Sequence, residues 1–475
     1  MVPATLFQRA GLALLPLTLL GACAVPGGQQ QPASDILPAR YERATDSPPA
    51  SMGNDSGWRD YFSHPELQAL IAQALANNRD LRTAALRVQE AQALYGIQRS
   101  GLMPSVGVMA DGQRGRTPAS LSPSRQSMVS SSYSVGLGLA SWEIDFWGRI
   151  RHLSDAALQN YLATDAAQRA LRISLVAEVA NTWLLQREYD QRIEIARQSV
   201  STRQESNRIY TRRYEVGASS LLELTQVRTL LTQAQALLEQ LEQARERNGN
   251  ALALLAGGPV DLTPRTGLLD RQLKLRPVTA GLPSALLTQR PDIIAAEHQL
   301  AAARAQIGAA RAAFFPSISL TGMLGTASHE LDGLFQGGNR TWSFMPSISL
   351  PIFTAGRLRN NLNLAEARAD MAVANYEKTV QSAFRDVSDA LSARHWLQRQ
   401  LATHTQGLQA QRQRARLVRM RYDSGAVSYL EVLDAERSLL QAEQDHVVTQ
   451  RQLLAAQIQL FAALGGGSLG STPQP

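Results

Sequence analysis

Few residues of this 475-residue chain stand at spacings that could carry out chemistry. Cys23 is the one cysteine, so the chain can form neither an intrachain disulfide framework nor a cysteine-rich zinc site. The seven histidines show no HExxH or other metal-ligand spacing, and the serines of the long loops do not stand in a GxSxG elbow. Neither lysine, Lys274 or Lys378, follows a glycine, which excludes a Walker A nucleotide loop. We therefore expect no enzyme activity, no metal and no cofactor.

The cysteine follows a segment that is typical of an export signal. Residues 1–22 carry a positive charge at Arg9 and then an apolar run, Ala10–Leu20, that is too short to span a bilayer. The run ends in Leu20-Gly21-Ala22-Cys23, which resembles the bacterial lipobox, where cleavage precedes a cysteine that then receives acyl chains such as palmitate. Several acyl chains would give stable anchoring at Cys23. An ordinary secretory signal with a chance cysteine is the alternative.

The residues on either side of the main body have the composition of tethers. Segment 23–58 is rich in Pro, Gly, Gln and Ser and is expected to form an extended, lipid-anchored linker. Ala24 rather than aspartate follows the cysteine, which in lipoproteins of this type favours sorting to the outer membrane. The tail 465–475 is expected to be disordered.

The main body is a tandem duplication. Residues 213–224 match residues 421–432 at an offset of 208 positions, with seven of the twelve residues identical. Gly148-Arg149-Ile150-Arg151 returns as Gly356-Arg357-Leu358-Arg359 at the same offset. Collinear matches at nearly one offset indicate two copies of a unit of about 210 residues.

Each copy has the same order of elements: a helix, two strands and a long helical hairpin. We place the first repeat at 59–263 and the second at 264–464. No glycine or proline lies between Arg151 and Val216, which predicts a helix of about 100 Å. Such a length predicts coiled-coil packing. The other expected helices are Pro65–Ser100, Ser219–Ala256, Pro283–Ala312, Arg357–Ser424 and Val427–Leu464.

Of the four expected strands, the second, third and fourth each show one apolar face and one face of small or polar residues, with a period of two. The apolar faces carry Tyr133, Val135, Leu137 and Leu139 in the second strand, Ile318 and Leu320 in the third, and Trp342, Phe344, Ile348, Leu350 and Ile352 in the fourth. Long polar loops are expected at 112–132 and 327–340. In a lipoprotein-like chain this pattern favours a transmembrane β-barrel over a soluble half-buried sheet.

Four strands are too few for a closed barrel, because the smallest known barrels have about eight. An oligomer is therefore required, in which each protomer lends a pair of hairpins. No segment after the signal has 18 consecutive apolar residues, so no transmembrane helix is expected there.

Several further stretches are distinctive. They are Ser141-Trp142-Glu143-Ile144-Asp145-Phe146-Trp147-Gly148-Arg149, Gly281-Leu282-Pro283-Ser284, Arg290-Pro291-Asp292, Phe314-Phe315-Pro316, Arg421-Tyr422, Tyr429-Leu430-Glu431-Val432-Leu433-Asp434-Ala435 and Ala463-Leu464-Gly465-Gly466-Gly467. Through them the chain resembles, over essentially its whole length, the outer-membrane efflux factors. These are TolC-like ducts, and the lipidated OprM/NodT branch is the most similar.

The resemblance implies a fold that is mainly α with a membrane β-barrel. A homotrimer would close one twelve-stranded outer-membrane β-barrel, which continues into a long periplasmic α-helical barrel. Such ducts bind a periplasmic adaptor (membrane fusion) protein and an inner-membrane RND-type pump, and they expel drugs or other small toxic compounds across the outer membrane. The pump supplies the energy, and the duct itself is no enzyme.

The resemblance also implies roles for the two glycine turns that end the longest helices. The expected adaptor contacts are Gly217, Ala218, Ser219, Gly425, Ala426 and Val427. From the residues alone, Gly217 and Gly425 are helix C-cap residues, and both roles are compatible.

Leu430, Glu431 and Asp434 begin the helix after the second turn. Glu431 and Asp434 are three residues apart and share a helix face. A three-fold axis would stack them as carboxylate rings whose like charges repel, hold cations and raise pKa values. In the resembling family the matching positions form the periplasmic gate and its selectivity filter. The alternative is a solvated face with a surface pair between Asp434 and Arg437.

Tyr422, Arg421 and Glu223 are candidates for links that close the gate. One branch of the family has an arginine two residues after the turn glycine, but Val427 stands there in this chain. That difference leaves the identity of the linking residues open.

The formal charge of +7 comes with a basic cluster near the second tip. Its members are Arg412, Arg414, Arg416, Arg419 and Arg421. In an exported lipoprotein we expect this surface to face an adaptor or another helix, and we do not expect it to bind nucleic acid. Two other functions stay open: the outer-membrane duct of a type I protein secretion system, and a lipidated periplasmic coiled-coil adaptor, although adaptors have a single helical hairpin.

Overall fold

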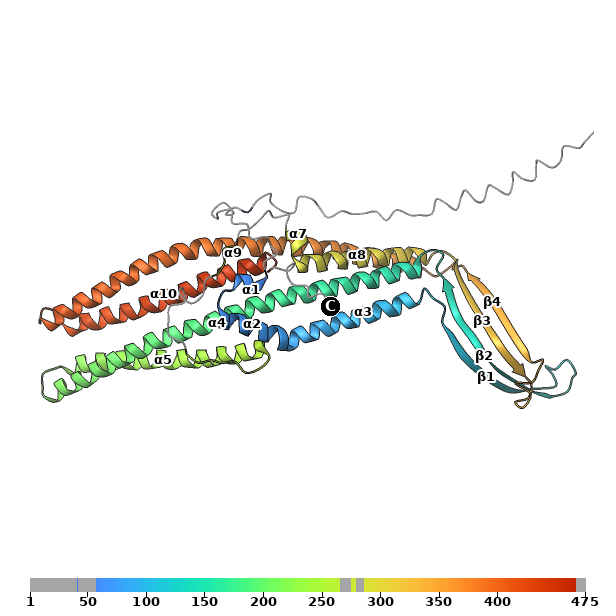
Figure 1. Cartoon of the computed structure of the whole chain (residues 1–475), viewed down its shortest axis with the longest axis horizontal. Coiled ribbons are helices and arrows are strands. Elements are labelled where there is room, and N and C mark those ends of the chain that lie inside the picture. The colour runs from blue at the N-terminus through green and yellow to red at the C-terminus, as the bar shows by residue number, and fades with distance from the viewer. Residues whose placement is uncertain (1–40, 42–56, 265–274, 279–285, 467–475) are drawn as a thin grey trace, which may run out of the picture.

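Two helices of 67 residues each determine the length of the molecule. They are α4 (Arg149–Glu215) and α9 (Arg357–Asp423), and each runs from the sheet at one end of the rod to a turn at the opposite end (Figure 1). At 1.5 Å per residue each is about 100 Å long. Their starts and their ends differ by the same 208 positions, so the structure confirms both the duplication and the predicted helix lengths.

The computed structural model describes residue 41 and residues 57–264, 275–278 and 286–466. The expected signal peptide, Cys23 and nearly all of the linker lie outside the described residues, as does the chain after residue 466.

Two shorter helices, α5 (Leu221–Ala256) and α10 (Tyr429–Ala463), return from the turns and pack on α4 and α9 respectively. On the sheet side, α3 (Arg79–Ser100) packs on α4, and α8 (Pro291–Ala312) packs between α4 and α9. The short helices α1 (Trp58–Tyr61), α2 (Pro65–Asn77) and α7 (Leu286–Gln289) lie near the middle of the rod (Figure 1). No helix of the described part of the chain is both long and apolar enough to cross a lipid bilayer.

The expected single helix Pro65–Ser100 is wrong, because the chain breaks at Asn78. The Asn78 backbone is extended, and its side-chain oxygen accepts a hydrogen bond from the Leu81 amide at 3.0 Å, which caps α3. Its side-chain amide also donates to the Leu255 carbonyl, 177 residues away. This tertiary contact fixes a bend that the local apolar pattern does not reveal.

The main core lies at mid-length, where α1 and α2 pack against α4 and α10. Trp183, Tyr61 and Phe62 are almost completely buried there. The rings of Tyr61 and Phe461 stack with centroids 4.1 Å apart and so join the two ends of the folded chain.

Four antiparallel strands form one sheet in the order β1-β2-β3-β4. The strands are β1 (Val106–Thr117), β2 (Met128–Ile144), β3 (Ser317–Ser328) and β4 (Arg340–Ser349). Two of the expected details are wrong. The polar segment 112–132 is mostly strand, since Gly112–Thr117 pairs with Met128–Tyr133, and the fourth strand ends before Leu350 and Ile352. Ladder hydrogen bonds come from the backbone, so a polar composition does not prevent strand pairing.

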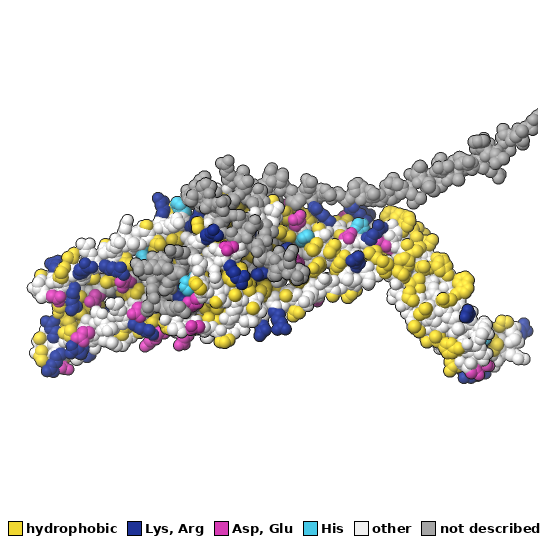
Figure 2. All heavy atoms as spheres, viewed as in Figure 1, with side chains coloured by type: hydrophobic (Ala, Val, Ile, Leu, Met, Phe, Trp, Pro, Cys, Tyr) yellow, Lys and Arg dark blue, Asp and Glu magenta, His cyan; other side chains and the backbone are white. Residues whose placement is uncertain are grey.

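One face of the sheet is apolar from edge to edge. Val108, Leu137, Leu324 and Trp342 are direct cross-strand neighbours, and each side chain is more than half exposed (Figure 2). The other face carries mostly small or polar residues, together with Met109, Met323 and Met345. On it, Gly136 faces Gly325 so closely that a Cβ on either would meet the partner strand's backbone. The predicted alternation is therefore confirmed.

Four helices continue the sheet in the same order as its strands. Contacts run from α3 to α4, from α4 to α8 and from α8 to α9, while the strands run from β1 to β4. The molecule is thus a curved layer with two long open edges, one made of α3 and β1 and the other of α9 and β4 (Figure 1).

Candidate functional site

Both tip turns end their helices in the same way. Gly217 and Gly425 have φ angles of 76° and 75°, which are left-handed values that favour glycine. The amide of Ala218 donates to the Arg213 carbonyl, and the amide of Ala426 donates to the Arg421 carbonyl. This is the Schellman arrangement, so the predicted C-cap role is confirmed. Ser219 and Val427 lie half-buried in these turns.

The helices that leave the two turns begin differently, although their sequences match. Ser220 and Glu223 form a complete capping box at the start of α5, in which Glu223 also accepts a hydrogen bond from Ser219. These hydrogen bonds lower the pKa of Glu223, and the bond from the Ser220 amide has the largest effect. At the start of α10, the Ser428 side chain makes no capping bond. Glu431, the counterpart of Glu223, remains exposed.

Asp434 is held in ion pairs rather than exposed as a free carboxylate. Arg414 of α9 donates to it at 2.6 Å and Arg437 at 2.8 Å. The hydrogen bond from Arg414, assisted by both positive charges, lowers the pKa of Asp434. The surface pair with Arg437 that the sequence offered as an alternative is therefore present, and within one protomer the pKa shift is opposite to that expected of a carboxylate ring.

A groove of about 320 Å³ runs between α5 and α10 beside these residues. Leu430 and Asp434 line it on the α10 side, and Thr225 and Gln233 lie on the α5 side. Leu430 is 54% exposed although it is apolar, so it is available to another surface.

One hydroxyl joins the two hairpins near their tips. Tyr422 of α9 accepts a hydrogen bond from the Arg213 guanidinium at 2.8 Å, and its hydroxyl lies 3.1 Å from that of Tyr210. Burial and the bond to Tyr422 raise the pKa of Tyr210, and the same hydroxyl raises the pKa of Arg213. Tyr210 also stacks on Tyr429 of α10 with ring centroids 4.5 Å apart.

A second polar layer lies just behind this contact. Tyr429 donates to the Ser206 hydroxyl of α4 in a buried contact. Burial raises the pKa of Glu436, while the charges of Arg203 and Arg419 act in the opposite direction. Both layers therefore bring charged or polar groups of the second hairpin against α4 of the first.

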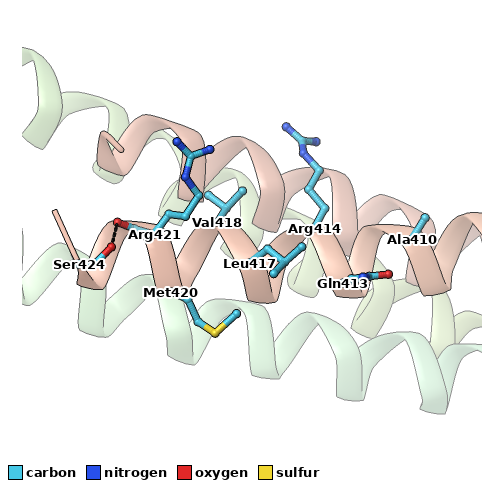
Figure 3. Close-up of a pocket in the computed structure, with 8 residues that line it drawn as sticks. All are labelled: Ala410, Gln413, Arg414, Leu417, Val418, Met420, Arg421 and Ser424. Carbon is cyan, nitrogen blue, oxygen red and sulfur yellow. Dashed lines mark hydrogen bonds between the residues drawn. The ribbon is translucent and has the colours of Figure 1, made fainter. Parts of the chain in front are cut away.

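Arg421 lies on a different surface from Tyr422. It lines an open depression of about 650 Å³ along α9 together with Arg414 and the exposed Leu417 and Met420 (Figure 3). Ser424 donates to the backbone carbonyl of Arg421 at 2.9 Å. The structure therefore does not join Arg421 and Glu223 to Tyr422 within one protomer.

Sequence reasoning selected Tyr422 but missed its partners Arg213 and Tyr210. The duplication contained part of the signal, because Arg213-Tyr214 is the first-copy match of Arg421-Tyr422. What the pattern did not indicate is that the arginine of one copy pairs with the tyrosine of the other, 209 positions away.

The described residues contain no group of three or more His, Cys, Asp or Glu side chains that could hold a metal ion. The hairpin ends instead carry exposed charges of both signs, in contrast to the apolar sheet (Figure 2). Such an arrangement is suited to contacts between helices and to conduction rather than to bond-making chemistry.

Comparison with known proteins agrees with this geometry. A model of the family described as outer membrane efflux protein matches the chain twice, over residues 70–258 and 282–466. The chain belongs to this family. Within it, the chain is 43% identical over 462 residues to the outer membrane protein OprJ of Pseudomonas aeruginosa, with 96% of this chain and 95% of OprJ covered. It is 42% identical over 470 residues to the toluene efflux pump outer membrane protein TtgF of Pseudomonas putida, with 97% of each covered.

The fold also matches that of a solved outer membrane channel. The open state of the MtrE outer membrane channel of Neisseria gonorrhoeae superposes with a TM-score of 0.84 at 39% identity, over 94% of this chain and 99% of that one. The protein is therefore an outer-membrane efflux channel with a TolC-like fold, and this family of transport ducts is not enzymatic.

Replacing the cross-hairpin hydroxyl tests its role. Tyr422→Phe removes the acceptor for Arg213 and keeps the ring, so the contact between the two hairpins should lose a charge-assisted hydrogen bond. We expect the resting conductance in planar lipid bilayers to rise by about threefold to tenfold.

The matched control is Tyr214→Phe. Tyr214 stands at the equivalent position of the first repeat and is 43% exposed, so its variant should conduct like the wild type. Equal conductance of the Tyr422 and Tyr214 variants would show that the bond between Tyr422 and Arg213 does not restrict conduction.

Proposed function

We propose that this efflux channel works as a homotrimer and forms the outer-membrane exit duct of a tripartite pump. In this assembly, a periplasmic adaptor binds the hairpin tips and an RND-type inner-membrane pump delivers the cargo. The observation that carries the proposal is the curved layer with two open edges, joined to an apolar sheet at one end and paired tips at the other.

The open strand edges support the trimer. A lipid-facing sheet cannot leave backbone N–H and C=O groups unpaired, so β1 and β4 require partners. Three copies would supply twelve strands, which is an ordinary number for a barrel, whereas one copy is far below the minimum of about eight. The edge made of α9 and β4 of one copy then lies against α3 and β1 of the next.

The positions of exposed apolar residues along α3 and α9 indicate which residues of two neighbouring copies would meet. Leu86 lies 14 residues before the end of α3 and Met371 lies 14 residues after the start of α9, so both are about 21 Å from the sheet. Leu94 and Leu364 match in the same way, at six and seven residues from those helix ends. All four apolar side chains are about half exposed in the protomer, as expected for surfaces that a second copy covers.

Chemical cross-linking tests the trimer and its register. A chain with Leu86→Cys and Met371→Cys should form covalent dimers and trimers with a short bismaleimide, visible as a ladder on denaturing gels. Leu86→Cys with Leu417→Cys is the control, since Leu417 lies about 70 Å farther along α9. A ladder from the control pair, or none from the test pair, would contradict this arrangement.

The start of α10 is the proposed gate. In a trimer, Leu430, Glu431 and Asp434 of three copies would converge at the narrow end of the duct. The contacts within one protomer support different tasks for the two carboxylates. Glu431 is exposed and can supply charge to the lumen, whereas Asp434 links α10 to α9 through Arg414.

Single substitutions separate these two tasks. Glu431→Gln should weaken cation selectivity by about twofold with little change in conductance, because it removes charge and no contact. Asp434→Asn should raise resting conductance, because it weakens the ion pairs that residue 434 forms with Arg414 and with Arg437. Bilayer recordings in asymmetric salt measure both cation selectivity and resting conductance. If the two variants change these quantities in the same way, the two carboxylates do not have separate tasks.

We also propose that the mature chain begins at Cys23 and is lipid-anchored in the outer membrane through it, after cleavage of the signal 1–22. The support is the lipobox-like Leu20-Gly21-Ala22-Cys23 and the tether-like composition of 23–58. Cys23→Ser should abolish incorporation of labelled palmitate while leaving the folded channel in place. Labelling that persists in this variant would exclude Cys23 as the attachment site.

The cargo that we propose is small and toxic, such as organic solvents and antibiotics. The support comes from relatives at 40% to 42% identity, whose names specify efflux of toluene or antibiotics. These names favour efflux over type I protein secretion. The alternative of a coiled-coil adaptor is wrong, because the family model and the channel fold cover both repeats.

A further inference from the structure

The large apolar residues of the four strands are sorted by type between the two faces of the sheet. By the strand register, every valine, leucine, isoleucine and aromatic residue of β1 to β4 lies on the apolar face. All methionines of these strands lie on the opposite face, and they are Met109, Met128, Met323 and Met345. In a membrane barrel the apolar face contacts lipid, so the methionines line the lumen.

These methionines are apolar side chains that the protomer leaves uncovered. Met345 is 55% exposed and Met109 is 36% exposed, while Met323 is half-buried. Leucine would be about as apolar and similar in volume, so apolarity alone does not explain why methionine stands at each position. What methionine adds is an unbranched, adaptable chain and a polarisable thioether.

The side chain of Met109 lies across the neighbouring strand. A Cβ on Gly138 of β2 would lie 2.4 Å from the Sδ of Met109 and 2.9 Å from its Cε, so glycine is needed there to leave room. The direct partner of Gly138 on β3 is Met323. Since the Cβ positions of direct cross-strand partners are about 5 Å apart, the thioether of Met109 lies beside Met323.

Met345 extends this arrangement to β4. Met323 pairs with Ser343, and Met345 stands two residues farther along β4 on the same face, a diagonal spacing that long side chains can bridge. We call Met109, Met323 and Met345 the methionine row. Its members lie three to six residues from the ends of their strands beside the helices, which is about 10–20 Å into the barrel.

The chemistry of the row favours a neutral ring over an ion. Its cross-strand partners are Gly136, Gly138, Thr321 and Ser343, which carry no charge. Thioether sulfurs make favourable contacts with the edges of aromatic rings, and the flexible chains can adapt to rings of different shape.

We propose that the methionine row is a contact site for small neutral aromatic molecules that pass through the barrel. The inference rests on the proposed function, and it assigns the aromatic part of the cargo a place in the duct. The names of two relatives specify toluene, which has this chemistry. Contact with an open wall is weak, which suits a duct because cargo that binds tightly would not leave.

Methyl NMR spectroscopy tests the site directly. The full-length channel, labelled with ¹³C at the methionine methyl groups, is titrated with benzyl alcohol, a water-soluble neutral aromatic probe. The Met109 and Met323 methyl signals should shift together and saturate, because the ring lies between them. The signals of Met371 and Met420, which lie on α9, should stay in place.

Two pairs of variants on the same face separate the row from the rest of the wall. Met323→Ser removes a thioether, whereas Met128→Ser is the control, since Met128 lies about 34 Å from Gly138 along β2. Gly138→Ala displaces Met109, whereas Gly107→Ala adds a methyl group that meets nothing within 4 Å. The half-saturating concentration should rise by about threefold or more in Met323→Ser and Gly138→Ala, and should not change in the two controls.

Each result supports or overturns the proposal. A rise confined to Met323→Ser and Gly138→Ala would support it, and either variant suffices if the other does not fold. Equal changes in all four variants, or a wild type without saturable shifts, would overturn it. Shifts with silver nitrate but not with benzyl alcohol would replace it with a soft-metal site. A wild type that binds the probe but does not export toluene from cells would instead refute the proposed function.

Discussion

An unpaired strand edge cannot face lipid hydrocarbon, and the sheet of this channel has two such edges. The arrangement of the other elements is consistent with that constraint. The helices α3, α4, α8 and α9 follow the order of the strands, so the same two edges continue through the helical layer. Half-exposed leucines and methionines lie along them instead of a closed core. One chain therefore has the form of a segment of a wall. Its main core lies at mid-length, where α1 and α2 pack on α4, and smaller buried clusters lie between the helices elsewhere, one of them near the tips.

The two repeats share a backbone plan but have diverged in their charges. Glu223 closes a capping box on its own helix, whereas its counterpart Glu431 stays exposed. Buried Glu188 bonds Arg451, whereas the equivalent position is Trp396. Substitutions of this kind leave helix propensity nearly unchanged, because charged and other polar side chains are tolerated on long helices. The two long helices are thus equal in length, and at this pair of equivalent positions only α4 carries a carboxylate that binds α10.

The sequence predicted those features that depend on neighbouring residues. The absence of glycine and proline predicted α4, and a matching stretch with Gly407 as its one glycine predicted α9. The alternating residues predicted the apolar sheet face, and the glycines predicted the tip turns. It did not predict the break at Asn78, because a carbonyl 177 residues away completes that contact. The pairing of Tyr422 with Arg213 was missed for the same reason, since the two repeats meet only in the folded chain. The polar composition at the end of β1 predicts a loop, whereas the strand pairing found there depends on backbone groups.

The equal length of α4 and α9 has a geometric meaning for the whole assembly. Both helices start beside the sheet and both contain 67 residues, so their end turns stand at the same height. Around a three-fold axis, six turns would then form one flat rim that a ring-shaped partner can meet without tilting. One inserted residue in either helix would lower its turn by about 1.5 Å and rotate it by about 100°. The equal length of the two 67-residue helices thus keeps the end of the duct level.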